Sequence, residues 1–340
     1  MSKKLSLFCL VILLLFSCGK SSEETVEQAI ITAENYLGAG LCQSAIDELE
    51  KIGRQNENAR YLITLASGYA CRAGYDTPTF ITSHLPNFAT PATLGGTTTF
   101  STSQTMDAPD NDAYEDVQTA IDILLYAGGI ESTKNPTVAR RAAKFTSREA
   151  AGINSFLMYL LITQLGKYLY YYGNASAAGV KGGGTTFTNN CIMNYTTTTT
   201  LSYDDDGSTG PNPPINTDVG TVLDSTTNGA CDSTQAGHPH LNIAASKTKR
   251  LCQGVVIWNN FLAVFPEVIG ASTGGDFGSI SGVQTTIDLY KDIVSNARTA
   301  DARMTDLVDM LSQTKCESEY SDTDEYFDIF FSLYFEILFV

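Results

Sequence analysis

Apolar residues recur at helical spacing along much of the chain. Between residues 25 and 39 they fall three or four positions apart, at Val26, Ala29, Ile30, Ala33 and Leu37. The stretch 42–52 repeats the pattern at Ala45, Ile46, Leu49 and Ile52, and a third such stretch covers residues 58–72. This spacing places the apolar side chains on one side of an α-helix. Because only short turns separate the three stretches, we expect antiparallel helical hairpins.

The same pattern predicts further helices at residues 113–127, 151–172, 243–269, 285–298, 302–311 and 322–340. Two of these, 151–172 and 322–340, are apolar enough to suggest membrane spans. Lys167 interrupts the first, Asp328 and Glu336 interrupt the second, and charges inside a bilayer are costly. We therefore interpret both as core helices and predict an all-α fold.

Two segments, residues 86–111 and 174–241, are rich in Thr, Pro, Gly and Ser. Such a composition buries too little apolar surface to fold alone, so it predicts polar loop insertions. The chain then divides into a helical region at 25–173 that contains the first loop, an insertion at 174–241 and a C-terminal helical region at 242–340.

Glycines mark the ends of a repeat pattern. Gly40 and Gly74 lie 34 residues apart, each after an alanine-rich helix, and Gly173 has a similar place after a later helix. The stretch 43–49 is also matched at 118–124, and the stretch 62–64 is matched at 161–163. Small residues let the helices of a hairpin approach, and glycine adopts turn conformations that a side chain resists.

The segment 33–40, Ala-Glu-Asn-Tyr-Leu-Gly-Ala-Gly, followed by Ala45-Ile46, resembles the tetratricopeptide repeat (TPR), whose period is also 34 residues. The chain departs from that family at Ala29 and Ile63, where an aromatic residue often stands, and it lacks the proline expected near Glu57. The resemblance implies a TPR-like solenoid of helical hairpins with a binding groove. An unrelated all-α bundle is the alternative.

The N-terminus has the layout of a secretory signal. Lys3 and Lys4 precede an apolar run at 5–16 that is short for a membrane span. The stretch Leu-Phe-Ser-Cys-Gly at 15–19 resembles the bacterial lipoprotein box, although Phe16 is bulkier than usual. The resemblance implies that residues 1–17 are removed, that Cys18 carries lipid and that 18–24 form a tether. An ordinary secreted protein is the alternative.

The same resemblance bears on location. Gly19 is not the aspartate that retains enteric lipoproteins at the inner membrane, which favours an outer-membrane lipoprotein facing the periplasm. Lys20 followed by Ser21 leaves the inner membrane as an alternative. The cell surface is another. The lipid makes the membrane one partner of the chain.

The formal net charge is −16, and it becomes −18 once Lys3 and Lys4 leave with the signal. Nucleic acids and anionic lipid surfaces are bound through basic footprints, so the charge of the whole molecule argues against both. A hydrophobic content of 43 % is enough for a substantial core.

Six cysteines remain after Cys9 leaves with the signal and Cys18 takes lipid. An even number in an exported chain suggests disulfides. Our preferred pairs are Cys42 with Cys71 and Cys191 with Cys231, each of which closes a short loop, and this leaves Cys252 with Cys316. No CxxC motif occurs, so neither a thiol redox role nor a zinc ribbon is expected.

Two clusters of side chains could carry chemistry. Asp204, Asp205 and Asp206 supply the oxygen ligands that calcium prefers, but without the alternating spacing of an EF-hand. His238 and His240 could share a transition metal, yet no third ligand stands nearby in the sequence. We interpret both clusters as polar loop residues, and we predict no metal and no cofactor.

No motif of nucleophilic, phosphate-binding or dinucleotide chemistry occurs, so we do not expect an enzyme. Tyrosines at 168, 170, 171 and 172 suit either an interface or the buried end of a helix, and we favour the buried end. We interpret the chain as a binding or assembly scaffold of the cell envelope, with an envelope protein or a small ligand as partner. The alternatives are a metal-binding protein or enzyme that uses Asp204–Asp206 and the histidines, and a structural surface lipoprotein.

Overall fold

The computed structural model describes residues 22–75, 111–175, 189, 191–195, 231, 235–271, 302–321 and 325–336. Within these ranges every regular element is a helix, which confirms the all-α prediction. The β pairing found in the same ranges is one isolated parallel bridge between Cys191 and Gly237.

The first three helices are α2 (Ser22–Gly38), α3 (Cys42–Glu50) and α4 (Ala59–Arg72). They confirm the helices predicted at 25–39, 42–52 and 58–72. At the start of α4, the side chain of Asn58 accepts a hydrogen bond from the Tyr61 backbone N–H at 2.9 Å. Such a cap fixes where a helix begins, because it satisfies a donor that has no partner inside the helix.

The next helices are α8 (Asp112–Leu125), α9 (Val138–Ala142) and α10 (Ser147–Tyr172). Asn111 caps α8, and Thr146 caps α10 in a reciprocal pair with the Glu149 side chain. Periodicity predicted α8 and α10. It did not predict α9, which is too short to show a repeating apolar pattern.

The C-terminal helices are a 3₁₀ turn, η3 (Ala244–Ser246), followed by α12 (Lys247–Ala271), α14 (Ala302–Val308), α15 (Gln313–Glu319) and α16 (Glu325–Tyr334). The helix predicted at 302–311 starts where expected but ends three residues early. The pattern did not predict α15, and the helix predicted at 285–298 lies outside the described residues.

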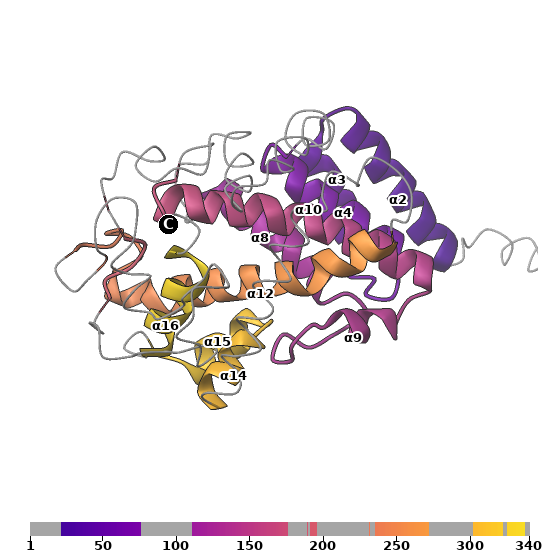
Figure 1. The fold of residues 1–340 in the computed structure, drawn as a ribbon. Helices are drawn as coiled ribbons and strands as arrows, with labels where there is room; N and C mark the ends of the chain where they lie inside the picture. The colour runs from indigo at the N-terminus through magenta and orange to yellow at the C-terminus, as the bar shows by residue number, and fades with distance from the viewer. Residues whose placement is uncertain are drawn as a thin grey trace, which may run out of the picture.

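Successive helices pack against each other in a stack (Figure 1). Helix α2 contacts α3 and α4; α4 also contacts α3, α8 and α10; α10 contacts α8 and α12. Helix α12 runs antiparallel to α10, because the Tyr168 hydroxyl near the end of α10 donates to the Arg250 carbonyl near the start of α12, at 2.9 Å. Helix α15 packs on α12, and α14 packs on α16.

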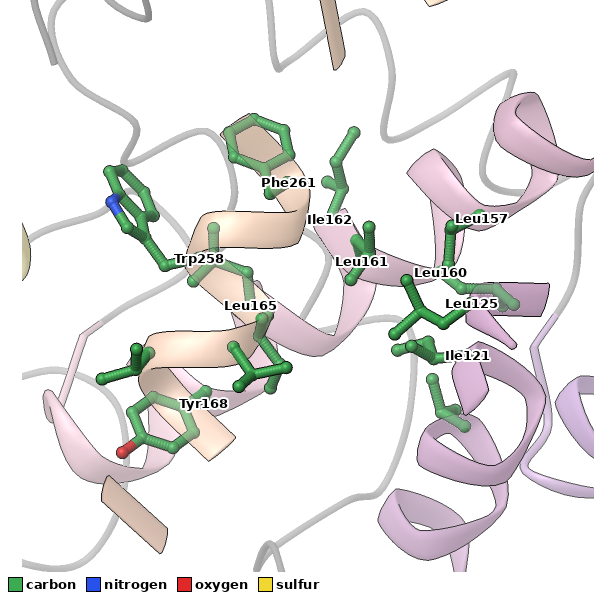
Figure 2. Close-up of a cluster of buried hydrophobic side chains, with 14 of the residues drawn as sticks. Ile121, Leu125, Leu157, Leu160, Leu161, Ile162, Leu165, Tyr168, Trp258 and Phe261 are labelled. Atoms are coloured by element: carbon green, nitrogen blue, oxygen red, sulfur yellow. The ribbon is translucent and has the colours of Figure 1, made fainter. Parts of the chain in front are cut away.

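The core is continuous from α8 through α10 to α12. Figure 2 shows these helices contributing the labelled side chains Ile121, Leu125, Leu157, Leu160, Leu161, Ile162, Leu165, Tyr168, Trp258 and Phe261. All of them are at most 1 % exposed. Burial on this scale is the main stabilising contribution in a helical protein, at roughly 1.5–3 kcal/mol for each large side chain.

The charged residues that argue against membrane spans are themselves buried. Lys167 is 1 % exposed, Asp328 is 5 % exposed and Glu336 is fully buried. Within the described ranges one helix, Ala244–Val268, is long and apolar enough to cross a membrane, with a mean hydropathy of 1.2 in its most apolar window. Other parts of the molecule bury 83 % of that window, as expected of a core helix.

Parts of the segment 174–241 also lie in the core, so the prediction of a polar loop is wrong for them. Cys191, Ile192 and Met193 are at most 1 % exposed, and His238 and Leu241 are fully buried. These apolar residues are too few and too widely spaced to give a periodic signal among the threonines and glycines.

A buried carboxylate holds one of these pieces in place. Glu336, just after α16, accepts hydrogen bonds from the Ile192 backbone N–H at 2.6 Å and from the Tyr195 hydroxyl at 2.9 Å. Two donors meet one oxygen of this buried acid, which offsets part of the cost of removing it from water.

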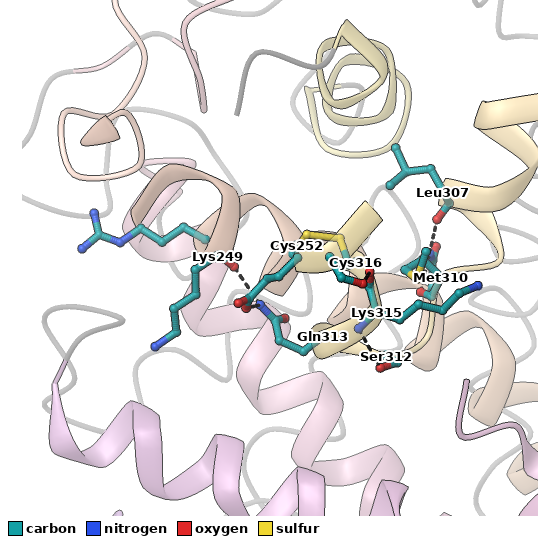
Figure 3. Close-up of a disulfide and its surroundings, with 12 residues drawn as sticks. Lys249, Cys252, Leu307, Met310, Ser312, Gln313, Lys315 and Cys316 are labelled. Carbon is teal, nitrogen blue, oxygen red and sulfur yellow. Dashed lines mark hydrogen bonds between the residues drawn. A yellow bond between two sulfur atoms is a disulfide. The ribbon is translucent and has the colours of Figure 1, made fainter. Parts of the chain in front are cut away.

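Three disulfides join the same pairs that the sequence favours: Cys42 with Cys71, Cys191 with Cys231, and Cys252 with Cys316. The last two are fully buried, whereas Cys42 and Cys71 are half-buried. Figure 3 shows the third, which ties α15 to α12. The three bonds close loops of 29, 40 and 64 residues and thus constrain distant parts of the unfolded chain.

Candidate binding surface

Helices α2, α4 and α10 lie side by side and run in the same direction. Arg60, in the first turn of α4, reaches Glu27 in the first half of α2. A Cβ placed on Gly152, near the start of α10, would lie 3.6 Å from the Cδ1 atom of Ile63 in α4. The three helices therefore begin at one end of the molecule, and they share one face.

Apolar side chains lie partly open on this shared face. Ile31 of α2 is 46 % exposed, and Ile63 of α4 is half-buried. On α10, Phe156 and Tyr159 are half-buried, and the ring of Phe156 lies 6.4 Å from that of Tyr75 in an edge-on arrangement. These partly exposed aliphatic and aromatic side chains on adjacent helices make this face a candidate for binding.

A charged triad borders this apolar set. The guanidinium of Arg60 donates twice to the Glu34 carboxylate, at 2.9 and 2.6 Å, and once to Glu27. These bonds to Glu34, together with the charges of both glutamates, raise the pKa of Arg60. The triad is exposed, so its contribution to stability is small, and it marks where α4 lies against α2.

The other end of the same helices has matching turns. After α2, Gly40 has φ +72° and the Leu41 N–H donates to the Tyr36 carbonyl at 2.8 Å. After α4, Gly74 has φ +77° and the Tyr75 N–H donates to the Ala70 carbonyl, also at 2.8 Å. This is the same C-terminal glycine motif twice, with every equivalent residue 34 positions apart.

The prediction that Gly173 serves the same purpose is wrong. Gly173 has φ −81°, in the ordinary helical range, and the left-handed residue after α10 is Asn174, with φ 51°. Asparagine tolerates this conformation better than most residues, because its short polar side chain can form local hydrogen bonds.

The matched stretches 43–49 and 118–124 have matching contacts. In α3 the Gln43 amide donates to the Asp47 carboxylate at 2.7 Å, and in α8 the Gln118 amide donates to Asp122 at 3.0 Å. The glutamine oxygens accept from the next helix in each case, from Arg72 of α4 and from Gln164 of α10. Burial raises the pKa of Asp122 to about 6.

The stretches 62–64 and 161–163 do not lie at equivalent positions along their helices. Thr64 and Thr163 both donate to the carbonyl four residues earlier. Yet Ile63 faces Gly152, whereas its match in the sequence, Ile162, is ten residues further along α10. Ten helical residues span about 15 Å. The likeness of 62–64 to 161–163 is therefore one of local composition.

His238, which is buried, and His240, which is half-buried, lie together beside the tyrosines at the end of α10. The His238 ring is 4.5 Å from that of Tyr171 and 5.3 Å from that of Tyr172, and the His240 ring is 5.5 Å from that of His238. The Tyr171 hydroxyl is hydrogen-bonded to Nδ1 of His240. Tyr168, Tyr171 and Tyr172 are at most 4 % exposed, so the buried-end interpretation is correct for these three, whereas Tyr170 is half-buried.

His238 is held as a neutral ring. Its Nδ1 accepts a hydrogen bond from the His240 backbone N–H at 3.2 Å. Burial lowers the pKa of His238 to about 4, with smaller contributions from the neighbouring His240 and Arg250. A ring that packs on two tyrosines and accepts from the main chain has a structural role, joining residues 238–240 to the end of α10.

Among the described residues, no group of three or more His, Cys, Asp or Glu side chains is arranged to hold a metal ion. His238 and His240 are adjacent, but that part of the chain brings no third ligand to them. Asp204, Asp205, Asp206 and Cys18 lie outside the described residues.

The sequence did not reveal two features of this region. One is the triad around Arg60, which joins residues far apart in the chain. The other is Arg141, fully buried beside the end of α8, where its guanidinium donates to the Asn154 side chain at 2.9 Å and to the Pro136 carbonyl. Within the described ranges no carboxylate pairs with this cation, and the Leu125 carbonyl at the negative end of the α8 dipole accepts from it.

Comparison of the chain with protein-family models, with curated proteins and with solved structures finds no match.

Proposed function

We propose that the chain is an exported lipoprotein, acylated on Cys18, which binds a protein of the cell envelope through the shared face of α2, α4 and α10. The observation that carries this proposal is the partly exposed apolar set on three parallel, adjacent helices. Ile31 lies on the side of α2 that carries Glu27 and Glu34, and Ile63 lies one turn after Arg60 on α4. Phe156 and Tyr159 lie on the side of α10 that carries Gly152.

The packing order supports a TPR-like stack. If α2 and α3 form one hairpin, α4 and α8 the next, and α10 and α12 the third, then each first helix packs on the first helix before it and on the second helix of that hairpin. The matching glycine turns after α2 and α4, and the matching Gln–Asp pairs in α3 and α8, occupy equivalent places in this scheme. In such stacks the first helices line the binding surface.

The anchor is supported by the signal-like residues 1–17 and by the small residue before Cys18. Three disulfides are also consistent with an oxidising compartment outside the cytoplasm. Because α2 begins at Ser22, the folded body starts a few residues after the proposed lipid.

The chemistry of the shared face favours a partner with an apolar stripe. An amphipathic helix or extended segment would cover Ile31 and Ile63 and would meet the charged triad at the edge of this set. Partner helices and extended peptides are both recognised by a few apolar anchors within a polar rim.

The anchor is tested by mass spectrometry of the membrane-extracted protein. We expect an N-terminal peptide that begins at Cys18 and carries acyl chains, and we expect Cys18→Ala to release the protein from the membrane fraction. An unmodified N-terminal peptide would contradict the proposed lipidation and would not bear on the proposed binding face.

The face is tested separately by crosslinking in native membranes. Ile31→Glu combined with Ile63→Glu places two charges in the apolar set, so we expect the captured partner to fall by at least about tenfold, as for loss of interface anchors. The matched control is Ile243→Glu. Ile243 is also apolar, is 47 % exposed and lies directly before η3. Equal capture by both variants would contradict the proposal.

A further inference from the structure

The end of the molecule where α2, α4 and α10 begin carries three exposed cations, Arg140, Lys144 and Arg148, which we call the basic corner. They belong to α9, to the turn after it and to the first turn of α10. The stem of Lys144 lies on the turn at Gly128, where a Cβ would meet the lysine Cβ and Cγ at 2.6 Å. A stem held along the main chain directs its ammonium group outward, toward water.

The basic corner has no ion pair within the described part of the chain. Other exposed cations do: Lys51 pairs with Glu48, and Lys134 pairs with Glu131 at 2.9 Å. From Lys134 to Arg148 the sequence has five basic residues and no acidic one, in a chain whose net charge is −16. The carboxylate next in the chain, that of Glu149, accepts hydrogen bonds from Thr146 in the cap of α10.

The corner lies at the end from which the proposed tether leaves. Helix α2 begins at Ser22, and four residues from Cys18 can span at most about 14 Å. Adjacent helices are about 8–10 Å apart, so α10 starts roughly 20 Å from α2 across α4. A body tilted about Ser22 therefore brings the basic corner to the surface in which the lipid is inserted.

We propose that the basic corner rests on the anionic phosphate headgroups of the membrane that holds the Cys18 lipid, and thereby sets the tilt of the molecule. The inference depends on the proposed anchor and is independent of partner binding. The lipid supplies the affinity, because the net charge of the whole molecule opposes adsorption.

Charge also decides which side of the molecule faces the bilayer. Glu23 and Glu24 lie in the first turn of α2, are exposed, and are repelled by the same headgroups. Contact through α9 and the start of α10 brings that side of the molecule toward the bilayer and moves α2 away from it. Each cation near an anionic bilayer favours contact by about fivefold, so the three cations favour it on the order of a hundredfold, and salt screens the effect.

The test uses the chain from Cys18 onward, which contains every described residue, coupled through the Cys18 thiol to a maleimide lipid in vesicles. Hydrogen exchange of the amides at 138–149 is compared on phosphatidylcholine vesicles with and without phosphatidylglycerol. We expect at least about threefold slower exchange on the anionic vesicles, reversed by high salt because exposed charges are then screened. The same rates on both vesicles would overturn the proposal.

Variants separate the corner from general charge effects. Arg140→Glu, Lys144→Glu and Arg148→Glu together should abolish the slowing. The matched control changes the formal charge equally at Lys247, Lys249 and Lys315, and it should retain the slowing. Loss of the slowing in both triple variants would overturn a localised contact.

If a triple variant fails to fold, the exchange rates of the unmodified chain still test the proposal, because they are compared between the two kinds of vesicle and between low and high salt. Because the lipid is attached chemically, failure here is distinct from an absence of acylation in cells, and neither result depends on the crosslinked partner.

Discussion

Buried polar residues of this protein are bonded mainly to main-chain groups and amides. Arg141 is the clearest case, because its acceptors are the Asn154 side chain and the carbonyls of Pro136 and Leu125. Burial lowers the pKa of Arg141 to about 10, which still leaves it charged near neutral pH. One residue thus joins the end of α8, the connection after it and the body of α10.

His238 provides a test of pH dependence. Its pKa in the folded protein is about 4, against 6.5 for an ordinary histidine. Between these values the unfolded chain binds a proton that the folded chain resists, so stability falls as pH drops through this window. The raised pKa of Asp122 acts in the opposite direction over a similar range. The histidine contribution must therefore be measured as a difference between two proteins.

We expect His238→Asn to reduce the acid sensitivity of folding. Asparagine does not titrate, and its Oδ1 can accept from the His240 N–H as Nδ1 does now. From about pH 7.5 to about pH 5, the free energy of unfolding of the variant should fall by about 1–2 kcal/mol less than that of the parent. Urea unfolding at the two pH values measures this. Parallel losses in both proteins would show that His238 does not carry the effect.

Among the elements, α2 and α4 end in the same way. Helices α2 and α4 close with a left-handed glycine and the same pair of main-chain hydrogen bonds. Neither Gly40 nor its neighbour Gly38 would place a Cβ near another atom, since nothing lies within 4 Å of either site. The two positions differ in backbone conformation, because Gly38 is helical and Gly40 has φ +72°.

This pair gives a matched stability prediction. Gly40→Ala forces a side chain into the left-handed region and should lower the free energy of unfolding by about 1 kcal/mol. Gly38→Ala adds a better helix former in open space and should raise it by a few tenths up to about 1 kcal/mol. Thermal or urea unfolding distinguishes the signs. A loss of equal size at both positions would refute the conformational explanation.

Helices with a repeating apolar pattern were predictable from the sequence. Periodicity identified α2, α3, α4, α8, α10, α12, α14 and α16, whereas α9 and α15 depend on tertiary contacts. The turn before α15 is held by Asn259, whose amide donates to the carbonyls of Leu307 and Met310, both at 2.9 Å. Asn135, from a distant connection, donates to the Asp309 carbonyl at 2.8 Å. No local pattern records such bonds.

For the whole molecule, the disulfides differ in accessibility. Cys252 and Cys316 are fully buried between α12 and α15, whereas Cys42 and Cys71 are half-buried at the ends of α3 and α4. Cysteine spacing predicted all three pairings, because each of the first two closes a comparatively short loop. The spacing could not indicate which bond a solvent reductant reaches first.

We expect the bond between Cys42 and Cys71 to be reduced first under native conditions, because attack by a thiolate requires access to a sulfur atom. Alkylation followed by peptide mapping at increasing times of reduction measures the order. Replacing Cys252 and Cys316 with alanine should cost about 4 kcal/mol of unfolding free energy, given the long loop that they close. Simultaneous reduction of all three bonds would contradict the predicted order.

The candidate binding face was only partly visible in the sequence. The resemblance to the tetratricopeptide repeat implied a binding groove, but it did not name the residues that would line it. The apolar repeat of α2 leaves out Ile31 but gives this residue no role, and the structure shows it 46 % exposed. Exposure depends on how α4 packs on α2, and no local pattern in the sequence records that packing.

The direction of the helices has a further consequence for tolerance to change. Helix α4 ends and α8 begins at one end of the stack, and Arg72 contacts Asp116 across the two at 2.8 Å. Tyr75 and Asn111, which flank residues 76–110, therefore lie at the same end of the stack. The cost of closing a loop grows only with the logarithm of its length. A reporter spliced between these two flanking points is therefore expected to leave the stacked helices in their arrangement.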